Sequence, residues 1–199
     1  ASGPFQAYGK APYRLIEAAI AEGADYRDFS DGAGFVRGVG RLDAAARARG
    51  VTILSGVSSF PVLTAAVVRH LAGAFSRIDT IRAGIAPSPH AVVGENVLKA
   101  IAGYAGQAVP ARRRGQTLLV HPLTEICRHT IAPPGRLPLP STLFSLVDVP
   151  DLLLLADLRP GVRSVWVGAG PRLEILHRCL IGLSLLVRWK LLPSLAPLA

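Results

Sequence analysis

Residues 24–55, ADYRDFSDGAGFVRGVGRLDAAARARGVTILS, decide the fold. The segment 24–29 predicts a short strand, and the β-branched run 51–55 is typical of a strand that is covered on both faces. The residues between them have the spacing of a helix. A strand, a helix and a second strand joined by short connections predict a parallel sheet with helices on its faces.

The helix between the two strands is predicted from its apolar spacing. Hydrophobic side chains recur at steps of three and four residues, at Phe35, Val36, Val39, Leu42 and Ala46. Ser30 and Asp31 can cap its first turn, and Gly50 ends it. We therefore expect one helix between the two strands.

The same alternation of helices and strands extends in both directions. Residues 11–22 have one apolar helical face, and a further helix is expected over residues 60–72. Residues 1–4 would then be the end of an earlier strand. Because the chain begins with Ala1 and contains no Met, we expect it to be part of a longer protein.

The pattern changes beyond residue 77. Residues 78–86 alternate between apolar and polar side chains, which predicts a strand with one solvated face, and residues 94–104 predict a helix. Residues 109–116 are expected to form a basic, irregular link, and residues 131–142 are rich in proline. We place a domain boundary at residue 77 and expect an α+β region after it.

Composition excludes some classes of protein. Half of the 199 residues are hydrophobic and 18% are charged, so the chain is not intrinsically disordered. The net charge of +9 favours an anionic partner. The only basic run, Arg112–Arg114, is too short to indicate nucleic-acid binding.

Two isolated cysteines, Cys127 and Cys179, indicate a reducing compartment, buried inert thiols and no metal site.

The last stretch, residues 172–199, is rich in leucine. Arg178, Arg188 and Lys190 interrupt its apolar run, so it is too short to span a membrane. It could be a helix buried against a sheet, or a basic amphipathic helix that lies on a membrane with Trp189 at the interface.

Three strand-to-helix junctions are the candidate site. They are Ser2–Gly9, Phe29–Gly32 and Ser55–Pro61, and each is rich in Gly, Ser, Asp or Pro. In a parallel sheet such loops meet at one edge, where ligands bind. Turn formation alone also favours these residue types, so both interpretations stay open.

The first junction offers the most specific chemistry. Gly3 permits close backbone approach, Pro4 stiffens the turn, and Phe5 offers a flat apolar surface suited to a nicotinamide or a ribose. Gln6 can orient a carboxamide or a substrate group. The alternative is an ordinary Gly-Pro turn with Phe5 in the core.

The other two junctions supply oxygens and backbone amides. Asp28 could bind ribose hydroxyls or a substrate amine, as could Asp31, although Asp31 also suits a helix cap. Ser58 and Ser59 could form an anion site at a helix N-terminus, with helix capping by Ser59 as the alternative.

The sequence contains no nucleophilic triad and no G-x-G-x-x-G motif. His121 and His129 are candidate acid/base groups, whereas His70 and His177 lie in predicted helices and are expected to be structural. Without the glycine motif, the pyrophosphate of a dinucleotide has no cradle in these residues.

These motifs resemble the saccharopine dehydrogenase-like family. Its members show a G-P-F or G-P-Y turn, a Y-x-D-L segment and a G-x-x-S-x-P turn. The corresponding residues here are 1–6 (ASGPFQ), 26–31 (YRDFSD) and 55–61 (SGVSSFP). The resemblance covers residues 1–106, and it continues more loosely through 148–151 (DVPD) and 160–165 (PGVRSV).

The resemblance implies an α/β fold. Residues 1–77 would form the C-terminal half of a Rossmann-type parallel sheet that binds NAD(P). Residues 78–199 would form an α+β region that shapes the substrate site and mediates homodimerisation. Gly3, Pro4 and Phe5 would line the nicotinamide end of the cofactor, with Asp28 and the Ser58/Ser59 turn close by.

The activity that the resemblance implies is hydride transfer between NAD(P) and a small-molecule substrate in a cytoplasmic oxidoreductase. The first strand, the glycine loop and the ribose-binding residue would precede Ala1, so we expect this chain alone to bind no dinucleotide. The alternative is a non-catalytic or membrane-associated binding protein that retains the dehydrogenase fold. It would contact lipid through residues 172–199.

Overall fold

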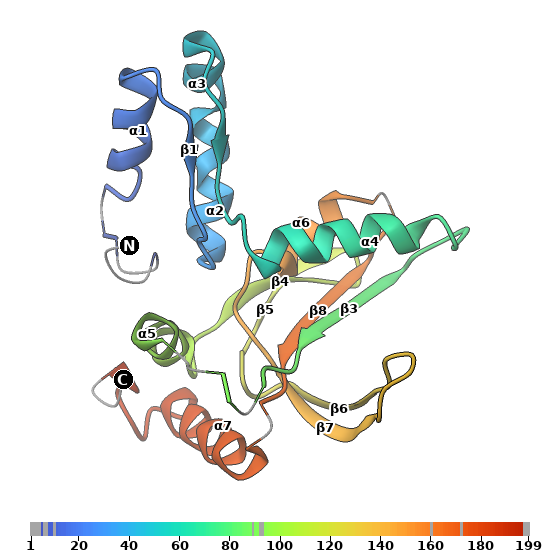
Figure 1. Ribbon diagram of the computed structural model, residues 1–199. Coiled ribbons are helices and arrows are strands. Elements are labelled where there is room, and N and C mark those ends of the chain that lie inside the picture. Colours follow the sequence, from blue (N-terminus) through green and yellow to red (C-terminus); the bar gives the residue numbers. More distant parts are fainter. Residues whose placement is uncertain are drawn as a thin grey trace. The chain divides into compact units, whose positions relative to one another are not determined.

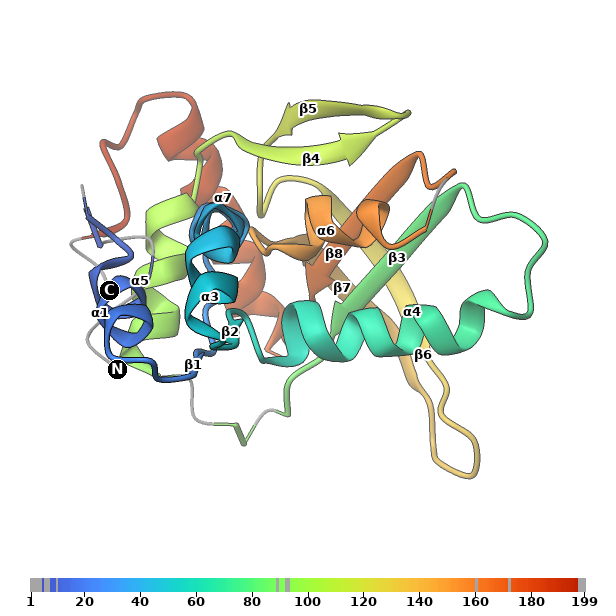
Figure 2. The same ribbon diagram turned by 90° about the horizontal axis from the view of Figure 1, so that it is seen from above.

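The chain is a mixed α/β protein. The computed structural model describes residues 5, 8–9, 11–88, 90–91, 94–159, 161–171 and 173–196 (Figures 1 and 2). They belong to two compact units. Unit 1 comprises Ala1–Asp79 together with Asp148–Val162, and unit 2 comprises Thr80–Val147 together with Arg163–Ala199.

Unit 1 consists of short helices around one pair of strands. Its elements are α1 (Arg14–Ala21), β1 (Tyr26–Arg27), α2 (Ala33–Val39), α3 (Asp43–Arg49), β2 (Ile53–Leu54), α4 (Thr64–Ala72) and α6 (Asp151–Asp157). The strands are parallel, with Tyr26 opposite Ile53 and Arg27 opposite Leu54. The predicted order of a strand, helical residues and a parallel strand is therefore present.

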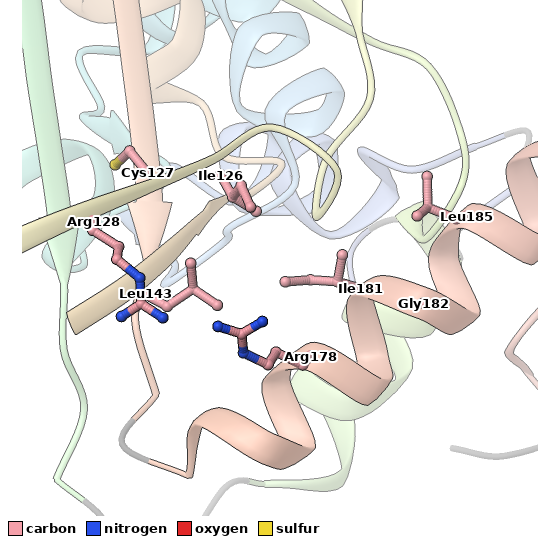
Figure 3. A pocket seen from close by; sticks show the side chains of 8 residues that line it. All are labelled: Ile126, Cys127, Arg128, Leu143, Arg178, Ile181, Gly182 and Leu185. Atoms are coloured by element: carbon pink, nitrogen blue, oxygen red, sulfur yellow. The ribbon is translucent and has the colours of Figure 1, made fainter. Parts of the chain in front are cut away.

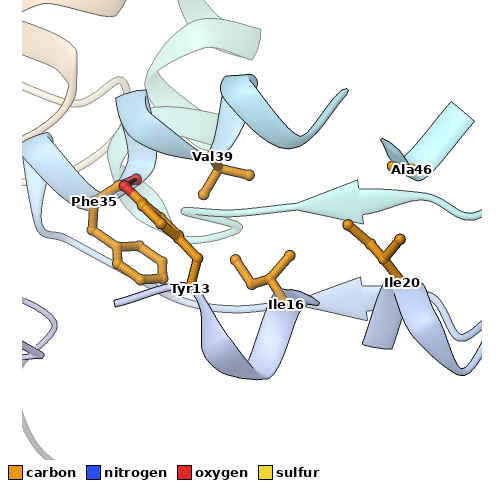
Figure 4. Close-up of a cluster of buried hydrophobic side chains, with 6 residues drawn as sticks. All are labelled: Tyr13, Ile16, Ile20, Phe35, Val39 and Ala46. Carbon is orange, nitrogen blue, oxygen red and sulfur yellow. Dashed lines mark hydrogen bonds between the residues drawn. The ribbon is translucent and has the colours of Figure 1, made fainter. Parts of the chain in front are cut away.

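The core of unit 1 joins the helices on either side of the strand pair. Its buried side chains come from α1 and the residue before it and from α2 and α3: Tyr13, Ile16, Ile20, Phe35, Val39 and Ala46 (Figure 4). The Tyr13 hydroxyl donates a hydrogen bond to the Phe35 carbonyl oxygen at 3.0 Å. This bond satisfies the polar end of a buried ring and connects the residue before α1 to α2.

The helical stretch between β1 and β2 is broken, although one helix was predicted. A 3-10 turn at Gly40–Leu42 separates α2 from α3. Glycine weakens a helix, and Gly38 precedes the break while Gly40 begins it. The predicted caps are also wrong, because Gly32 is the N-cap of α2 and no side chain caps it. Gly50 ends α3 in the left-handed conformation, as predicted.

The helix predicted over residues 60–72 begins later than expected. Ser59–Leu63 form a wide turn, in which Phe60 is extended (φ −116°, ψ 122°), and α4 begins at Thr64. Pro61 accounts for the extended Phe60, because a residue before proline is disfavoured in the helical conformation.

Unit 2 is built on a four-stranded mixed sheet in the order β3-β8-β7-β6. Its elements are β3 (Thr80–Ile85), α5 (Glu95–Tyr104), β4 (Val109–Arg113), β5 (Gln116–Val120), β6 (Ile126–Ile131), β7 (Leu139–Leu146), β8 (Ser164–Ala169) and α7 (Glu174–Arg188). β3 and β8 are parallel, whereas β7 is antiparallel to both β8 and β6. The ribbon of unit 2 is seen from above in Figure 2.

Residues 109–116 are not the irregular link that the sequence predicted. β4 and β5 form an antiparallel hairpin whose turn is Arg114–Gly115, with φ of 50° and 82°. Positive φ at both turn residues matches the twist of paired strands. Arg113 contacts both the Val165 carbonyl oxygen and Glu125, so interactions distant in sequence hold these basic residues in a strand.

The helix α7 contacts β7 of this sheet. Its His177 is hydrogen-bonded through Nε2 to the Ser145 hydroxyl of β7 at 2.7 Å, and both residues are buried. Burial lowers the pKa of His177, which keeps the ring neutral. α7 also packs against α5, where Gly106 N–H donates to the Ser184 hydroxyl at 2.9 Å.

The sequence predicted that residues 172–199 are too short to span a membrane and that the two cysteine thiols are buried. Within the described part of the chain, no helix combines the length and the apolar character that crossing a bilayer requires. The thiols are less buried than predicted, because Cys179 is exposed on α7 and Cys127 is half-buried on β6. A helical cysteine that faces away from the sheet lies in solvent, which composition alone does not reveal.

Candidate functional site

Asp28 joins the loops that follow β1 and β2 in unit 1. Its Oδ1 accepts hydrogen bonds from Ser30 N–H at 2.8 Å, from Gly56 N–H at 2.9 Å and from the Ser55 hydroxyl at 2.9 Å. The side chain is buried, with 8% of its surface exposed. Because the strands are parallel, both loops leave from the same edge of the pair, and one carboxylate binds them together.

The backbone around Asp28 reinforces this connection. Asp28 N–H donates to the Leu54 carbonyl oxygen at 3.1 Å, and Val57 N–H donates to the Asp28 carbonyl oxygen at 2.8 Å. Gly56 has a φ of +75°, and a Cβ there would lie 2.9 Å from Pro61 Cδ. Burial, followed by the negative charge of Asp28, raises the pKa of Tyr26 to about 12. Tyr26 is therefore a neutral hydrogen-bond donor beside the carboxylate.

A pocket of about 290 Å³ lies beside these loops in unit 1. Aromatic rings form much of its wall, with Phe5, Tyr13 and Phe35 among the lining residues, and the backbone of Gly32 and Gly34 forms another part. The Phe5 and Phe35 ring centroids are 5.0 Å apart. The pocket is close to the lower limit of small-ligand sites, about 300 Å³, so it can hold a single ring.

Asp148 places a carboxyl group in this pocket. Burial, followed by the negative charge of Asp31, raises the pKa of Asp148 to about 6. A carboxyl group with that pKa can both hold and release a proton near neutral pH. The pocket therefore combines a flat apolar surface for a planar ring with a carboxyl group that can exchange a proton with a bound molecule.

The predicted site residues have different positions in the structure. Gly3, Pro4 and Gln6 lie outside the described residues. Phe5 lines the pocket and packs against Phe35. Asp28 is buried and accepts a hydrogen bond from Gly56 N–H, and its assignment to the cofactor stays a prediction.

The two predicted serines lie in the loop after β2. Ser58 is half-buried, Ser59 is exposed, and no side chain caps the turn that follows them. Their assignment to a cofactor stays a prediction. Ser55 and Gly56, at the start of this loop, are hydrogen-bonded to Asp28. The sequence placed Asp28 at the junction after the preceding strand, on the same edge of the predicted sheet.

Asp148 was missed as a site residue. It lies far along the sequence from the three junctions, and no local motif marks it. The only sequence signal is its place in the Asp148–Asp151 segment, which carries part of the family resemblance.

The histidines contribute no cluster of catalytic groups. Burial, followed by the charge of Arg188, lowers the pKa of His121, and His129 is exposed on β6. Across the ranges that the structure describes, no three His, Cys, Asp or Glu side chains come close enough to bind a metal ion.

Unit 2 has a groove of about 540 Å³ between its β6–β7 hairpin and α7 (Figure 3). Its walls are mainly apolar, with Ile126 and Leu143 facing Ile181 of α7. Arg128 and Arg178 lie at one end, where both guanidinium groups bind Glu174. Glu174 therefore offsets one of the two positive charges and holds both guanidinium groups at this end of the groove.

The chain matches no known protein-family model, and no curated protein resembles it at a significant level.

Proposed function

We propose that this chain is part of a saccharopine dehydrogenase-like oxidoreductase that transfers hydride between NAD(P) and a small-molecule substrate. The observation that carries the proposal is the Asp28 connection, which places the loops after two parallel strands at one edge. In Rossmann-type sheets this edge binds the cofactor. The finer proposal for the fold is that β1 and β2 belong to the C-terminal half of such a sheet.

Asp148 gives the proposed reaction its proton. When bound, the nicotinamide would supply or accept the hydride at carbon. Reduction of a carbonyl or imine carbon also requires a proton on the neighbouring heteroatom. We assign that transfer to the Asp148 carboxyl group, which lines the aromatic pocket and has a pKa of about 6. Phe5 and Phe35 would provide the flat surface for the ring.

The test is a titration of the protein encoded by the complete reading frame with NADPH and NADH, followed by nicotinamide fluorescence. We expect binding of at least one of them. Ser58→Ala should weaken it by about fivefold, the effect of losing one hydrogen bond. Ser76→Ala, an exposed serine after α4, is the matched control and should leave the affinity unchanged. If neither dinucleotide binds, the oxidoreductase proposal is wrong.

A second candidate is peripheral membrane contact through residues 172–199. It is favoured by large apolar side chains that are exposed at both ends of α7: Ile175 (73%), Leu176 (61%), Trp189 (62%) and Leu191 (67%). Arg188, at the end of the same helix, is an exposed cation for anionic lipid headgroups.

Vesicle co-sedimentation tests this second candidate. We expect binding to vesicles that contain phosphatidylserine and little binding to pure phosphatidylcholine. Trp189→Ala should reduce the bound fraction at least twofold, whereas Trp166→Phe, a half-buried tryptophan of β8, should not. Equal binding to both vesicle types would contradict the proposal.

A further inference from the structure

The sheet of unit 2 carries a pocket of about 360 Å³ on one face. The strand register puts Arg82 of β3 opposite Trp166 of β8, and Cys127 of β6 opposite Phe144 of β7. Residues that face each other across paired strands point to the same side of a sheet. All four side chains line this pocket, so it draws on four neighbouring strands.

Two aromatic rings of this pocket, Trp166 and Phe144, lie against the backbone of glycines and form its floor. A Cβ on Gly168 would lie 2.6 Å from Trp166 Cζ3, and a Cβ on Gly170 would lie 2.9 Å from the Phe144 ring. A Cβ on Gly84 would lie 3.3 Å from the same ring. The two aromatic rings therefore occupy space that side chains would otherwise fill, and they lie against the backbone.

The charge around this aromatic floor is positive. Arg82 and His129 are exposed, and neither side chain has a hydrogen bond or an ion pair to another residue that the structure describes. None of the described residues that line the pocket is acidic. The Arg82 guanidinium lies close enough to the Cys127 thiol to oppose the rise in its pKa that burial causes. Arg82 is thus a cation at the pocket with no anion bound to it.

We propose that this pocket binds a planar aromatic molecule that carries one anionic group. The ring would stack on Trp166 above the Phe144 floor, and Arg82 would bind the carboxylate, sulfonate or phosphate. The volume lies in the range of small-ligand sites, about 300–1,000 Å³. None of these residues is among those assigned to the nicotinamide cofactor, so this proposal does not depend on the proposed oxidoreductase activity.

Naphthalene-2-sulfonate is a suitable probe because it is planar, aromatic and anionic at every working pH. The chain has two tryptophans, so its NMR spectrum has two indole N–H signals. We expect the Trp166 signal to shift on titration while the signal of the exposed Trp189 stays in place. Calorimetry should give a Kd of about 0.1–1 mM, as expected for a ligand of this size.

Two further probes test the contributions of the ligand's negative charge and of its planar ring separately. (Naphthalen-2-yl)methylammonium keeps the ring and reverses the charge, and cyclohexylmethanesulfonate keeps the charge and removes the planar ring. Each should bind at least about fivefold more weakly than the naphthalene sulfonate, because one contact of the pair is lost.

Two arginine substitutions test whether the sulfonate binds in this pocket. Arg82→Gln removes an exposed charge, so the chain should fold normally and bind the sulfonate about five- to tenfold more weakly. Arg69→Gln, which removes an exposed arginine of α4 that does not line the pocket, should have no effect.

Three results would overturn the proposal. The first is equal affinity for the sulfonate and the ammonium probe, and the second is unchanged affinity in Arg82→Gln. The third is a shift of the Trp166 signal with protein concentration alone, together with a dimer in sedimentation, which would show that a second copy of the chain covers this face.

Discussion

Replacing Asp28 with alanine is expected to lower the free energy of unfolding of unit 1 by about 3–5 kcal/mol. The change removes the acceptor for Ser30 N–H, Gly56 N–H and the Ser55 hydroxyl in a buried setting. Each buried donor left without a partner costs about 1–3 kcal/mol. A loss of this size is a large part of the stability of a typical domain, which is about 5–15 kcal/mol. Urea unfolding followed by circular dichroism measures it.

Asp25 provides the matched control for this change. It lies just before β1, and its Oδ1 accepts one hydrogen bond, from Thr52 N–H at 2.8 Å, in an exposed position. Asp25→Ala should therefore cost less than about 1 kcal/mol. Asp28→Asn keeps a carbonyl oxygen as acceptor and should give an intermediate loss. If Asp25→Ala and Asp28→Ala destabilise the chain equally, Asp28 does not hold the two loops together.

Asp151→Asn is expected to stabilise the chain by about 2 kcal/mol at pH 7.5 and to have almost no effect at pH 4. The Asp151 carboxyl group is fully buried, its Oδ1 is hydrogen-bonded to the Thr64 hydroxyl, and its Oδ2 has no partner among the described residues. Burial raises its pKa from 3.8 to about 6, and the Thr64 bond opposes the rise only in part.

The direction of the pH effect follows from proton binding. A carboxyl group with a raised pKa in the folded state binds more protons when folded than when unfolded. Its contribution to stability is therefore full below about pH 4, is lost as the pH rises to about 6, and stays lost above that. Each pKa unit corresponds to about 1.4 kcal/mol, and some access of water reduces the total. Thermal unfolding at both pH values measures the difference.

The neutral form also explains the geometry around Thr64. Its hydroxyl contacts both Asp151 and the Pro61 carbonyl oxygen, but it has only one proton to donate. A protonated Asp151 can donate to Thr64, which then donates to Pro61, and an asparagine amide can do the same. Asp157→Asn, at the exposed other end of α6, is the control. A stabilisation by Asp151→Asn that is equal at both pH values would contradict this account.

The parts of the fold that the sequence predicted are those with local causes. The apolar helical face of residues 11–22 predicted α1, the segment 94–104 was expected to be the helix now seen as α5, and the β-branched run predicted β2. The hairpin β4–β5 was missed because its turn is Arg114–Gly115 rather than Asn-Gly, and because Arg113 is held in place by Val165 and Glu125. Strand propensity depends on such distant contacts more than helix propensity does.

Only part of the candidate site could be predicted from the sequence. Turn-forming residues after two strands correctly indicated loops that meet at one edge, and Asp28 was chosen for its oxygens. The burial of Asp28 could not be predicted, because it depends on hydrogen bonds from Ser55 and Gly56, which follow a different strand. Asp148 reaches the pocket from a segment remote in sequence, so no local pattern indicated it.

Unit 1 is assembled from two separate stretches of chain, and this has a consequence for biosynthesis. The ribosome releases residues 1–79 first, and Asp148–Val162 follows only after the whole first segment of unit 2 has been made. The Asp151 partner of Thr64 is therefore absent from the nascent chain until the first segment of unit 2 has been synthesised. Residues 1–79 cannot complete their packing before α6 has been made, and incompletely packed domains of this kind are prone to aggregate.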